Sequence, residues 1–273
     1  MKSLYDVIKE RILVLDGAMG TMIQAYNLKE EDFRGERFKN YSSSLKGNND
    51  LLSITQPQII SEIHKKYLEA GADILETNTF SSNSISMADY NMEDLVYELN
   101  FESAKIAKKL SGEYSIKDSS KPRFVAGSIG PTNKTASMSP DVSDPGFRAI
   151  TFDELVISYT EQIKGLVDGG VDILLLETIF DTLNAKAALF AIDTYMENNK
   201  LDIPLMVSGT ITDQSGRTLS GQTVNAFMIS VSHMPIFSIG FNCALGADQL
   251  MPYVKRLSDK SQFYVSAHPN AGL

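Results

Sequence analysis

The only cysteine of this 273-residue chain, Cys243, follows an apolar run in the stretch SIGFNCALGADQL, residues 238–250. A thiol in this position can be a small buried group, a nucleophile or one ligand of a metal ion. A nucleophilic thiol needs a general base, and His268 is the histidine that follows a predicted strand. A zinc site needs three or four ligands, so Cys243 alone does not complete one. The residue types leave all three possibilities open.

Three acidic residues also stand directly after apolar runs: Asp16, Glu76 and Glu177. A carboxylate in such a place is costly to bury without a partner, and a substrate ammonium group is one natural partner. The alternative is a structural carboxylate that caps a loop or a helix N-terminus. Asp16 opens the turn DGAMGT, in which Gly17 and Gly20 allow a ligand to approach the backbone closely. The amides of this turn would suit a carboxylate.

Seven short apolar runs supply the strands that would position these residues. Continuous apolar runs of this length are typical of parallel strands that are buried on both faces. The runs are residues 12–15, 72–75, 124–126, 171–176, 205–207, 236–241 and 263–265.

Helical patterns lie between the runs. One helix is predicted with Thr55 as its N-cap, Pro57 in its first turn and Gly71 as its stop. A second begins at Thr151, where Glu154 completes a capping box, and ends at the glycine pair 169–170.

Strands that alternate with helices are compatible with a (β/α)8 barrel or a doubly wound sheet. The barrel is favoured because polar or small residues end every run, and a barrel brings all these ends to one mouth. In addition, no G-x-G-x-x-G follows the first run. We therefore expect one α/β domain over residues 1–273, a TIM-type barrel truncated after its seventh strand. The long polar segments 33–53 and 129–150 are predicted lids or binding loops.

The overall charge excludes some partners. The net charge is −9 and the pI is near 4.9, with no basic cluster, which argues against nucleic acid and an anionic membrane surface. The N-terminus lacks the uninterrupted apolar segment of a signal peptide or a membrane helix. One cysteine cannot form an intrachain disulfide, so a cytoplasmic location is predicted.

Several stretches together resemble one family. They are LDGAMGTMIQ, ETNTFSSNSISMADY, GSIGPTNKTASMSPDVSDPGFRAITFDEL, GGVDILLLETIFDTLNAKAAL, SGTITDQSGRTLSGQT and GFNCALGA. This set is similar to the N-terminal homocysteine-binding domain of the cobalamin-dependent methionine synthase family. The long loop and the SGRTLSGQT run distinguish this pattern from that of simpler homocysteine methyltransferases.

The resemblance implies a homocysteine S-methyltransferase barrel that binds zinc through three cysteine thiolates, with homocysteine sulfur as the remaining ligand. Cys243 matches the first thiolate, and the other two are expected beyond Leu273. Asp16, Gly17 and Gly20 match the turn that holds the amino-acid end of homocysteine. Glu177 matches an acid near its amino group, and Asn242 adjoins the metal ligand.

The resemblance further implies that homocysteine thiolate takes a methyl group from methylcobalamin, which methyltetrahydrofolate recharges. The cobalamin- and folate-binding domains would be the partners of this domain, and the chain alone is expected to be inactive or severely impaired. Two alternatives remain. One is a stand-alone homocysteine S-methyltransferase with a simple donor such as betaine or S-methylmethionine, and the other is a non-catalytic barrel that binds an amino acid or a partner domain.

Overall fold

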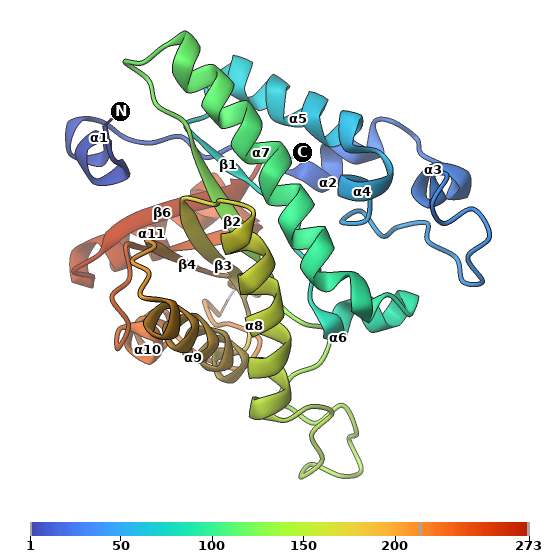
Figure 1. Cartoon of the computed structure of the whole chain (residues 1–273). Coiled ribbons are helices and arrows are strands. Elements are labelled where there is room, and N and C mark those ends of the chain that lie inside the picture. The colour runs from blue at the N-terminus through green and yellow to red at the C-terminus, as the bar shows by residue number, and fades with distance from the viewer. Residues whose placement is uncertain (1, 213–214, 272–273) are drawn as a thin grey trace. The chain divides into compact units, whose positions relative to one another are not determined.

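The computed structural model describes residues 2–212 and 215–271, and the chain divides into two compact units. The first unit comprises Met1–Ser128 and Lys164–Ile173, and the second comprises Ile129–Ile163 and Leu174–Leu273. Helices alternate with parallel strands, so the predicted α/β class is confirmed (Figure 1). The described helices include none that is long and apolar enough to cross a membrane.

The first unit contains most of the N-terminal helices and the parallel pair β1–β2, in which Ile74 lies opposite Phe124. Its elements are α1 (Leu4–Glu10), α2 (Met19–Gln24), α3 (Glu30–Arg34), α4 (Leu52–Thr55), α5 (Pro57–Ala70), β1 (Ile74–Glu76), α6 (Ser84–Met87), the 3-10 helices η1 (Ala88–Tyr90) and η2 (Glu93–Leu95), α7 (Val96–Lys117) and β2 (Phe124–Ile129).

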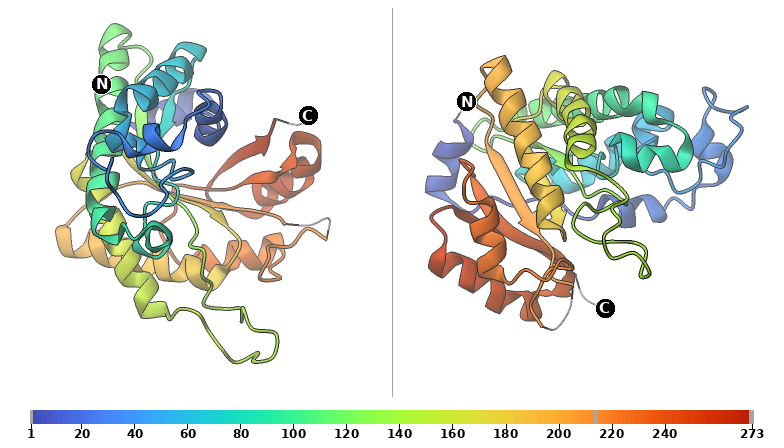
Figure 2. Two further views of the ribbon diagram at one scale, coloured as in Figure 1. Left: turned by 90° about the vertical axis from the view of Figure 1, so that its right-hand side faces the viewer. Right: turned by 90° about the horizontal axis from the view of Figure 1, so that it is seen from below.

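Helix α5 supplies one wall of the core of the first unit. It packs beside α7, as both views in Figure 2 show, and buries Ile60 and Ile63 completely. Pro57 begins the helix and Gly71 ends it in a left-handed conformation with φ 108°, as predicted. The predicted N-cap is wrong, because Thr55 is the last residue of α4 and its hydroxyl donates to the Leu51 carbonyl.

The second unit contains four consecutive parallel strands. β3 pairs with β4, β4 with β5 and β5 with β6, so this part of the sheet has no point where the strand order reverses. That order favours the barrel over a doubly wound sheet. The elements are α8 (Phe152–Asp168), of which the residues from Lys164 on belong to the first unit, β3 (Ile173–Ile179), of which Ile173 belongs to the first unit, α9 (Thr182–Asn199), β4 (Leu205–Gly209), α10 (Val224–Val231), β5 (Ser238–Gly246), α11 (Ala247–Lys260) and β6 (Tyr264–Asn270).

The capping box of α8 is confirmed. The Glu154 amide donates to Thr151 Oγ1 at 3.2 Å, and the Thr151 amide donates to the Glu154 carboxylate at 2.8 Å. Two backbone donors of the first turn are thereby satisfied.

The first predicted strand is wrong: the structure describes six strands, and residues 12–15 form only an isolated bridge, Leu15 to Ile74. The segment bonds β1 along one side, and the Val14 amide donates to the Asp73 carboxylate instead of a strand carbonyl. Ile12 and Val14 are 86% and 54% exposed, so the apolar run is not buried on both faces. The apolar composition of residues 12–15 predicts a strand, but their backbone forms only one bridge to β1.

The two long segments differ in character. Residues 33–53 belong to the core of the first unit, where Phe33, Leu45 and Leu51 are buried. Residues 130–150 form an extended loop without a helix or strand (Figure 2). Only the second segment has the form of a loop that could cover a ligand.

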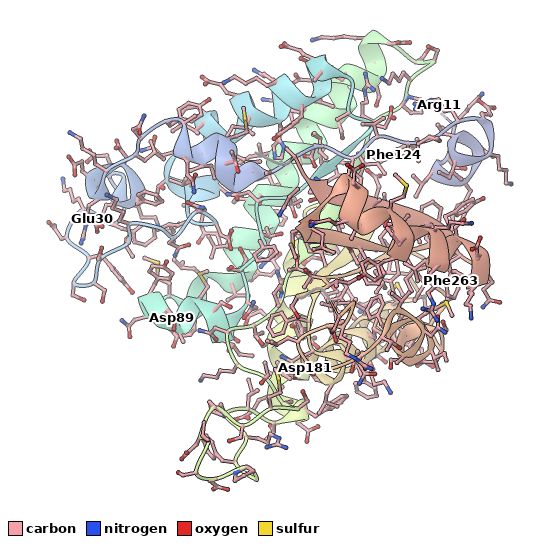
Figure 3. The ribbon with its side chains drawn as sticks, turned by 180° about the vertical axis from the view of Figure 1, so that it is seen from behind. Arg11, Glu30, Asp89, Phe124, Asp181 and Phe263 are labelled. Carbon is pink, nitrogen blue, oxygen red and sulfur yellow. The ribbon has the colours of Figure 1, made fainter. Side chains whose placement is uncertain are left out.

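A cluster of charges holds the N-terminal side of β1. Arg11, labelled in Figure 3, donates two hydrogen bonds to the buried Asp73 carboxylate, at 2.7 and 2.8 Å. Arg123 lies 3.2 Å and Lys121 3.8 Å from the same carboxylate. Burial disfavours the charged form of Asp73, but the bonds from Arg11 and Val14 outweigh it and lower the pKa.

Candidate functional site

Polar side chains gather at the C-terminal ends of the strands in each unit. In the first unit, Glu76 is the last residue of β1 and Asp16 follows the bridge to β1. In the second unit, Glu177 lies near the end of β3, Ser208 near the end of β4 and Cys243 in the last part of β5. Parallel strands place such ends at one edge of the sheet, which is the edge that forms active sites in barrels.

Asp16 is fixed by the backbone of β1. Its amide donates to the Ile74 carbonyl at 2.9 Å, and its Oδ2 accepts the Glu76 amide at 3.0 Å. The residue is 7% exposed. The carboxyl group of Asp16 is therefore held at the end of β1 by the Glu76 amide.

His64 lies beneath Asp16 on α5. The imidazole is fully buried, its Nδ1 is 4.0 Å from Asp16 Oδ2, and neither ring nitrogen has a hydrogen-bond partner among the described residues. Burial lowers the pKa of His64 to about 4, so the ring is neutral at pH 7. His64 is not among the residues that the sequence predicts for the site. Its place beside Ile63 on the apolar face of the helix indicated only that it is buried.

Tyr67, one turn further along α5, explains one of the two predicted glycines. A Cβ added at Gly17 would lie 2.7 Å from the Tyr67 ring, whereas a Cβ at Gly20 would lie 3.8 Å from its nearest neighbour. Gly17 is therefore required by packing, while Gly20 leaves space. Burial, followed by the charges of Asp16 and Glu76, raises the pKa of Tyr67, so its hydroxyl stays protonated.

Glu76 is a candidate that the sequence left undecided between function and structure. The surrounding protein withdraws water from its carboxyl group and raises its pKa to about 7. A carboxyl group with this pKa changes between its protonated and its charged form near neutral pH. Perturbed acids at strand ends are typical of functional sites.

Asn242 organises the site of the second unit. Its Oδ1 accepts the Thr178 amide at 3.1 Å and the Ser208 hydroxyl at 2.6 Å. Its Nδ2 donates to Thr178 Oγ1 at 2.7 Å and lies 3.4 Å from Cys243 Sγ. One amide thus connects the ends of β3, β4 and β5.

The backbone around this amide is strained. Thr178, Cys243 and Ala244 have φ values of 55°, 44° and 55°, which non-glycine residues rarely adopt. The β5–β6 register also shifts between Asn242 and Gly246. Bulges and left-handed residues redirect side chains and often lie next to active sites. The sequence could not predict this feature, because none of the three is glycine.

Glu177 and Cys243 are connected through this network. Glu177 Oε2 accepts the Thr178 hydroxyl at 3.3 Å, and Thr178 bonds Asn242. The Cys243 thiol lies 3.4 Å from Thr210 Oγ1 in addition to Asn242. His268 lies opposite Asn242 in the register of the β5–β6 pair, next to the position of Cys243.

The loop of residues 130–150 is anchored beside β3. Asp181, labelled in Figure 3, caps α9 and accepts the Ser137 hydroxyl at 2.5 Å. Asn184 donates to Thr132 Oγ1 at 3.0 Å and accepts the Ala136 amide at 2.9 Å. The start of the loop is therefore fixed, and the part beyond it is exposed.

The described residues do not provide a complete metal site. In residues 2–212 and 215–271, no group of three or more His, Cys, Asp or Glu side chains is arranged to hold a metal ion. Cys243 offers one thiol, whereas a three-thiolate zinc site needs two more. The side chains present therefore do not fit a zinc ion by themselves.

The fold and its strand-end residues define a class of protein that the comparisons identify. The sequence profile described as Homocysteine S-methyltransferase matches residues 13–273. The chain belongs to the homocysteine S-methyltransferase family, and it is a methyltransferase-type domain that fits homocysteine methylation.

Solved structures share the fold. The metallated form of the homocysteine methyltransferase MmuM from Escherichia coli is 19% identical, with a TM-score of 0.77 over 98% of this chain and 87% of that one. Its oxidised form is also 19% identical and gives a TM-score of 0.79 over 100% and 87%. At this identity, the likeness establishes the fold alone.

Proposed function

We propose that this chain is the homocysteine-binding domain of an enzyme that methylates homocysteine to methionine. The observation that carries the proposal is the placement of the only cysteine. Cys243 lies at the end of β5, in strained backbone, and its neighbour Asn242 joins it to the ends of β3 and β4. A strained, hydrogen-bonded strand end is typical of a catalytic site in this fold.

The site residues have separate roles in this proposal. In the first unit, Asp16 binds the substrate ammonium group, and amides of the turn with Gly17 and Gly20 bind its carboxylate. In the second unit, Glu177 is the acid that the resemblance assigns to an amino group. Asn242 positions the backbone next to Cys243. In the reaction, the sulfur of homocysteine loses its proton and forms a bond to the methyl carbon. The bond between this carbon and the donor breaks, and its electron pair leaves with the donor.

The methyl donor that we propose is methylcobalamin, recharged by methyltetrahydrofolate on cobalamin- and folate-binding domains outside these residues. The support is the resemblance of the 130–150 loop and of the SGTITDQSGRTLSGQT stretch, in which Asp213 and Gln214 lie outside the described residues. A stand-alone enzyme with a simple donor such as betaine or S-methylmethionine is the second candidate. The fold shared with MmuM over 98% of this chain supports it.

Zinc enters the proposal only with additional ligands. Cys243 would be one of three thiolates, and two others would have to come from outside the described residues. A cytoplasmic location is likewise part of the proposal. The roles proposed above for the side chains depend neither on zinc nor on the cellular location.

The test measures homocysteine binding by calorimetry and methionine formation by the purified chain. Homocysteine is supplied with methylcobalamin, betaine or S-methylmethionine in parallel, with and without added zinc, and methionine is measured by mass spectrometry. Product from methylcobalamin that is lost in Cys243→Ser supports the proposed donor. Product from a simple donor supports the second candidate, and an absence of homocysteine binding under all conditions contradicts both.

A further inference from the structure

The C-terminal end of β1 holds two neighbouring acidic residues, Asp16 and Glu76, whose charges both act on the hydroxyl of Tyr67. Asp16 Oδ2 accepts the amide of Glu76, so the two residues are fixed next to one another in the first unit. Asp16 comes from the segment before α2, and His64 and Tyr67 face the pair from α5. These four side chains are titratable groups of one cluster among the described residues.

Two adjacent acids withdrawn from water do not readily ionise together. Removal of water raises the pKa of Glu76 to about 7, so this group holds a proton during much of the time at neutral pH. The pair then carries one negative charge and one proton. A ligand that brings a positive charge would change this balance.

His64 is a second, independent indication of a ligand. It is fully buried, its Nδ1 lies 4.0 Å from Asp16 Oδ2, and both ring nitrogens lack a hydrogen-bond partner among the described residues. Buried polar atoms are nearly always hydrogen-bonded in native proteins, so an unpartnered one commonly marks the place of a ligand or water. Because the ring is neutral, it does not neutralise Asp16.

We propose that Glu76 is a further substrate-binding residue, which together with Asp16 receives the ammonium group of the amino acid in exchange for a proton. This inference rests on the proposed function, and it adds Glu76 to the residues that bind the substrate there. The ammonium group keeps its three protons, the proton of the carboxyl pair leaves to solvent, and both carboxylates become charged. The charge of the cluster stays at −1, because the second carboxylate and the ammonium group cancel.

The exchange of a proton for an ammonium group makes the site selective for amino acids with a free amino end. An amino acid with a free ammonium group completes the cluster, whereas an N-acylated amino acid brings no positive charge and leaves Glu76 protonated. The cluster therefore selects substrates by charge at the amino end, independently of the group at the sulfur end.

The test uses L-methionine, which carries the amino-acid end without an ionisable thiol. Calorimetric titration of the full chain in buffers of different ionisation enthalpy measures the protons released. At pH 7 we expect release of about half a proton per methionine, and binding about tenfold weaker at pH 6 than at pH 8. His64 and Tyr67 do not titrate in this range, since their pKa values lie near 4 and above 10.

The decisive variant is Glu76→Gln, with Glu93→Gln at an exposed position as its matched control. Glu76→Gln should bind methionine more weakly at pH 8, release no proton and lose the pH dependence, while Glu93→Gln behaves like the wild type. A cooperative thermal unfolding transition, at the wild-type temperature or above it, shows that Glu76→Gln is folded.

Two other outcomes are separable. Methionine binding without proton release, and with equal affinity at pH 6 and pH 8, overturns the role of Glu76 and leaves the proposed function intact. Failure of the wild type to bind both methionine and homocysteine overturns the two together.

Discussion

The two ends of β1 carry acidic residues in opposite surroundings. Asp73 precedes the strand and lies among Arg11, Lys121 and Arg123. Burial raises its pKa, but the hydrogen bonds from Arg11 and Val14 and the charges of Arg11 and Lys121 outweigh burial and hold the pKa below the usual value. Glu76 ends the strand beside another acid, and loss of water raises its pKa to about 7. Only two residues, Ile74 and Leu75, lie between these positions in the sequence.

The difference indicates that the acid at the N-terminal end of β1 stabilises the fold and that the acids at its C-terminal end serve ligand binding. At the N-terminal end the charges are neutralised within the protein, so the cluster ties residues 11–14, β1 and the start of β2 together. At the C-terminal end the acids lie beside His64, which is neutral and adds no positive charge. This division agrees with barrels in general, whose C-terminal face carries the chemistry.

The largest effect is expected from Asp73→Asn. The substitution leaves cations around a neutral, buried amide, and it should lower the free energy of unfolding by about 3 to 5 kcal/mol. Chemical denaturation measures the loss, and Asp202→Asn at an exposed site serves as the control. A loss below about 1 kcal/mol, as for surface ion pairs, would contradict a stabilising role for this end.

The same cluster predicts an acid limit. The folded-state pKa of Asp73 is lowered from 3.8, so its contribution is present above pH 3.8 and is lost as the pH falls through the lower folded value. The steep loss of wild-type stability below this pH should therefore be shallower in Asp73→Asn. Denaturation midpoints at pH 5, 4 and 3 measure it.

Glu76→Gln should change the free energy of unfolding in the opposite direction to Asp73→Asn. The folded-state pKa of Glu76 is raised from 4.5 to about 7, so wild-type stability falls as the pH rises between these values. The variant should lack this fall and should be more stable than the wild type at pH 8, on the order of 2 kcal/mol. A variant that is less stable at pH 8 would place Glu76 in the structural group with Asp73.

The smallest effect concerns the turn after Asp16. Gly17→Ala forces a Cβ against the Tyr67 ring and should cost about 1 to 2 kcal/mol, whereas Gly20→Ala has room and should be neutral or slightly stabilising. Thermal unfolding compares the two. A Tyr67→Leu substitution should rescue Gly17→Ala, and equal effects of the two glycine variants would refute the packing argument.

The sequence predicted those features that depend on local pattern. The apolar runs, the capping box of Thr151 and Glu154, and the polar residues at strand ends are all present. Residues 12–15 were misjudged because pairing depends on neighbours in space, which an apolar run does not reveal. Thr55 was misjudged because a second helix, α4, ends there.

The rest of the candidate site depends on tertiary structure. The burial of His64 against Asp16 follows from the packing of α5, and the raised pKa of Glu76 follows from dehydration. The amide of Asn242 reaches three strand ends only because β3, β4 and β5 are adjacent. Left-handed Thr178 and Cys243 have no signal in residue type.

The central claim is that the strand end with Asp16 binds the amino-acid end of homocysteine. Calorimetric titration of the full chain with L-homocysteine, in the wild type and in Asp16→Asn, tests it most directly. The account predicts saturable binding that weakens at least about tenfold in Asp16→Asn, the loss of one charged hydrogen bond. Equal affinity of the two proteins, or no binding by the wild type, would contradict it.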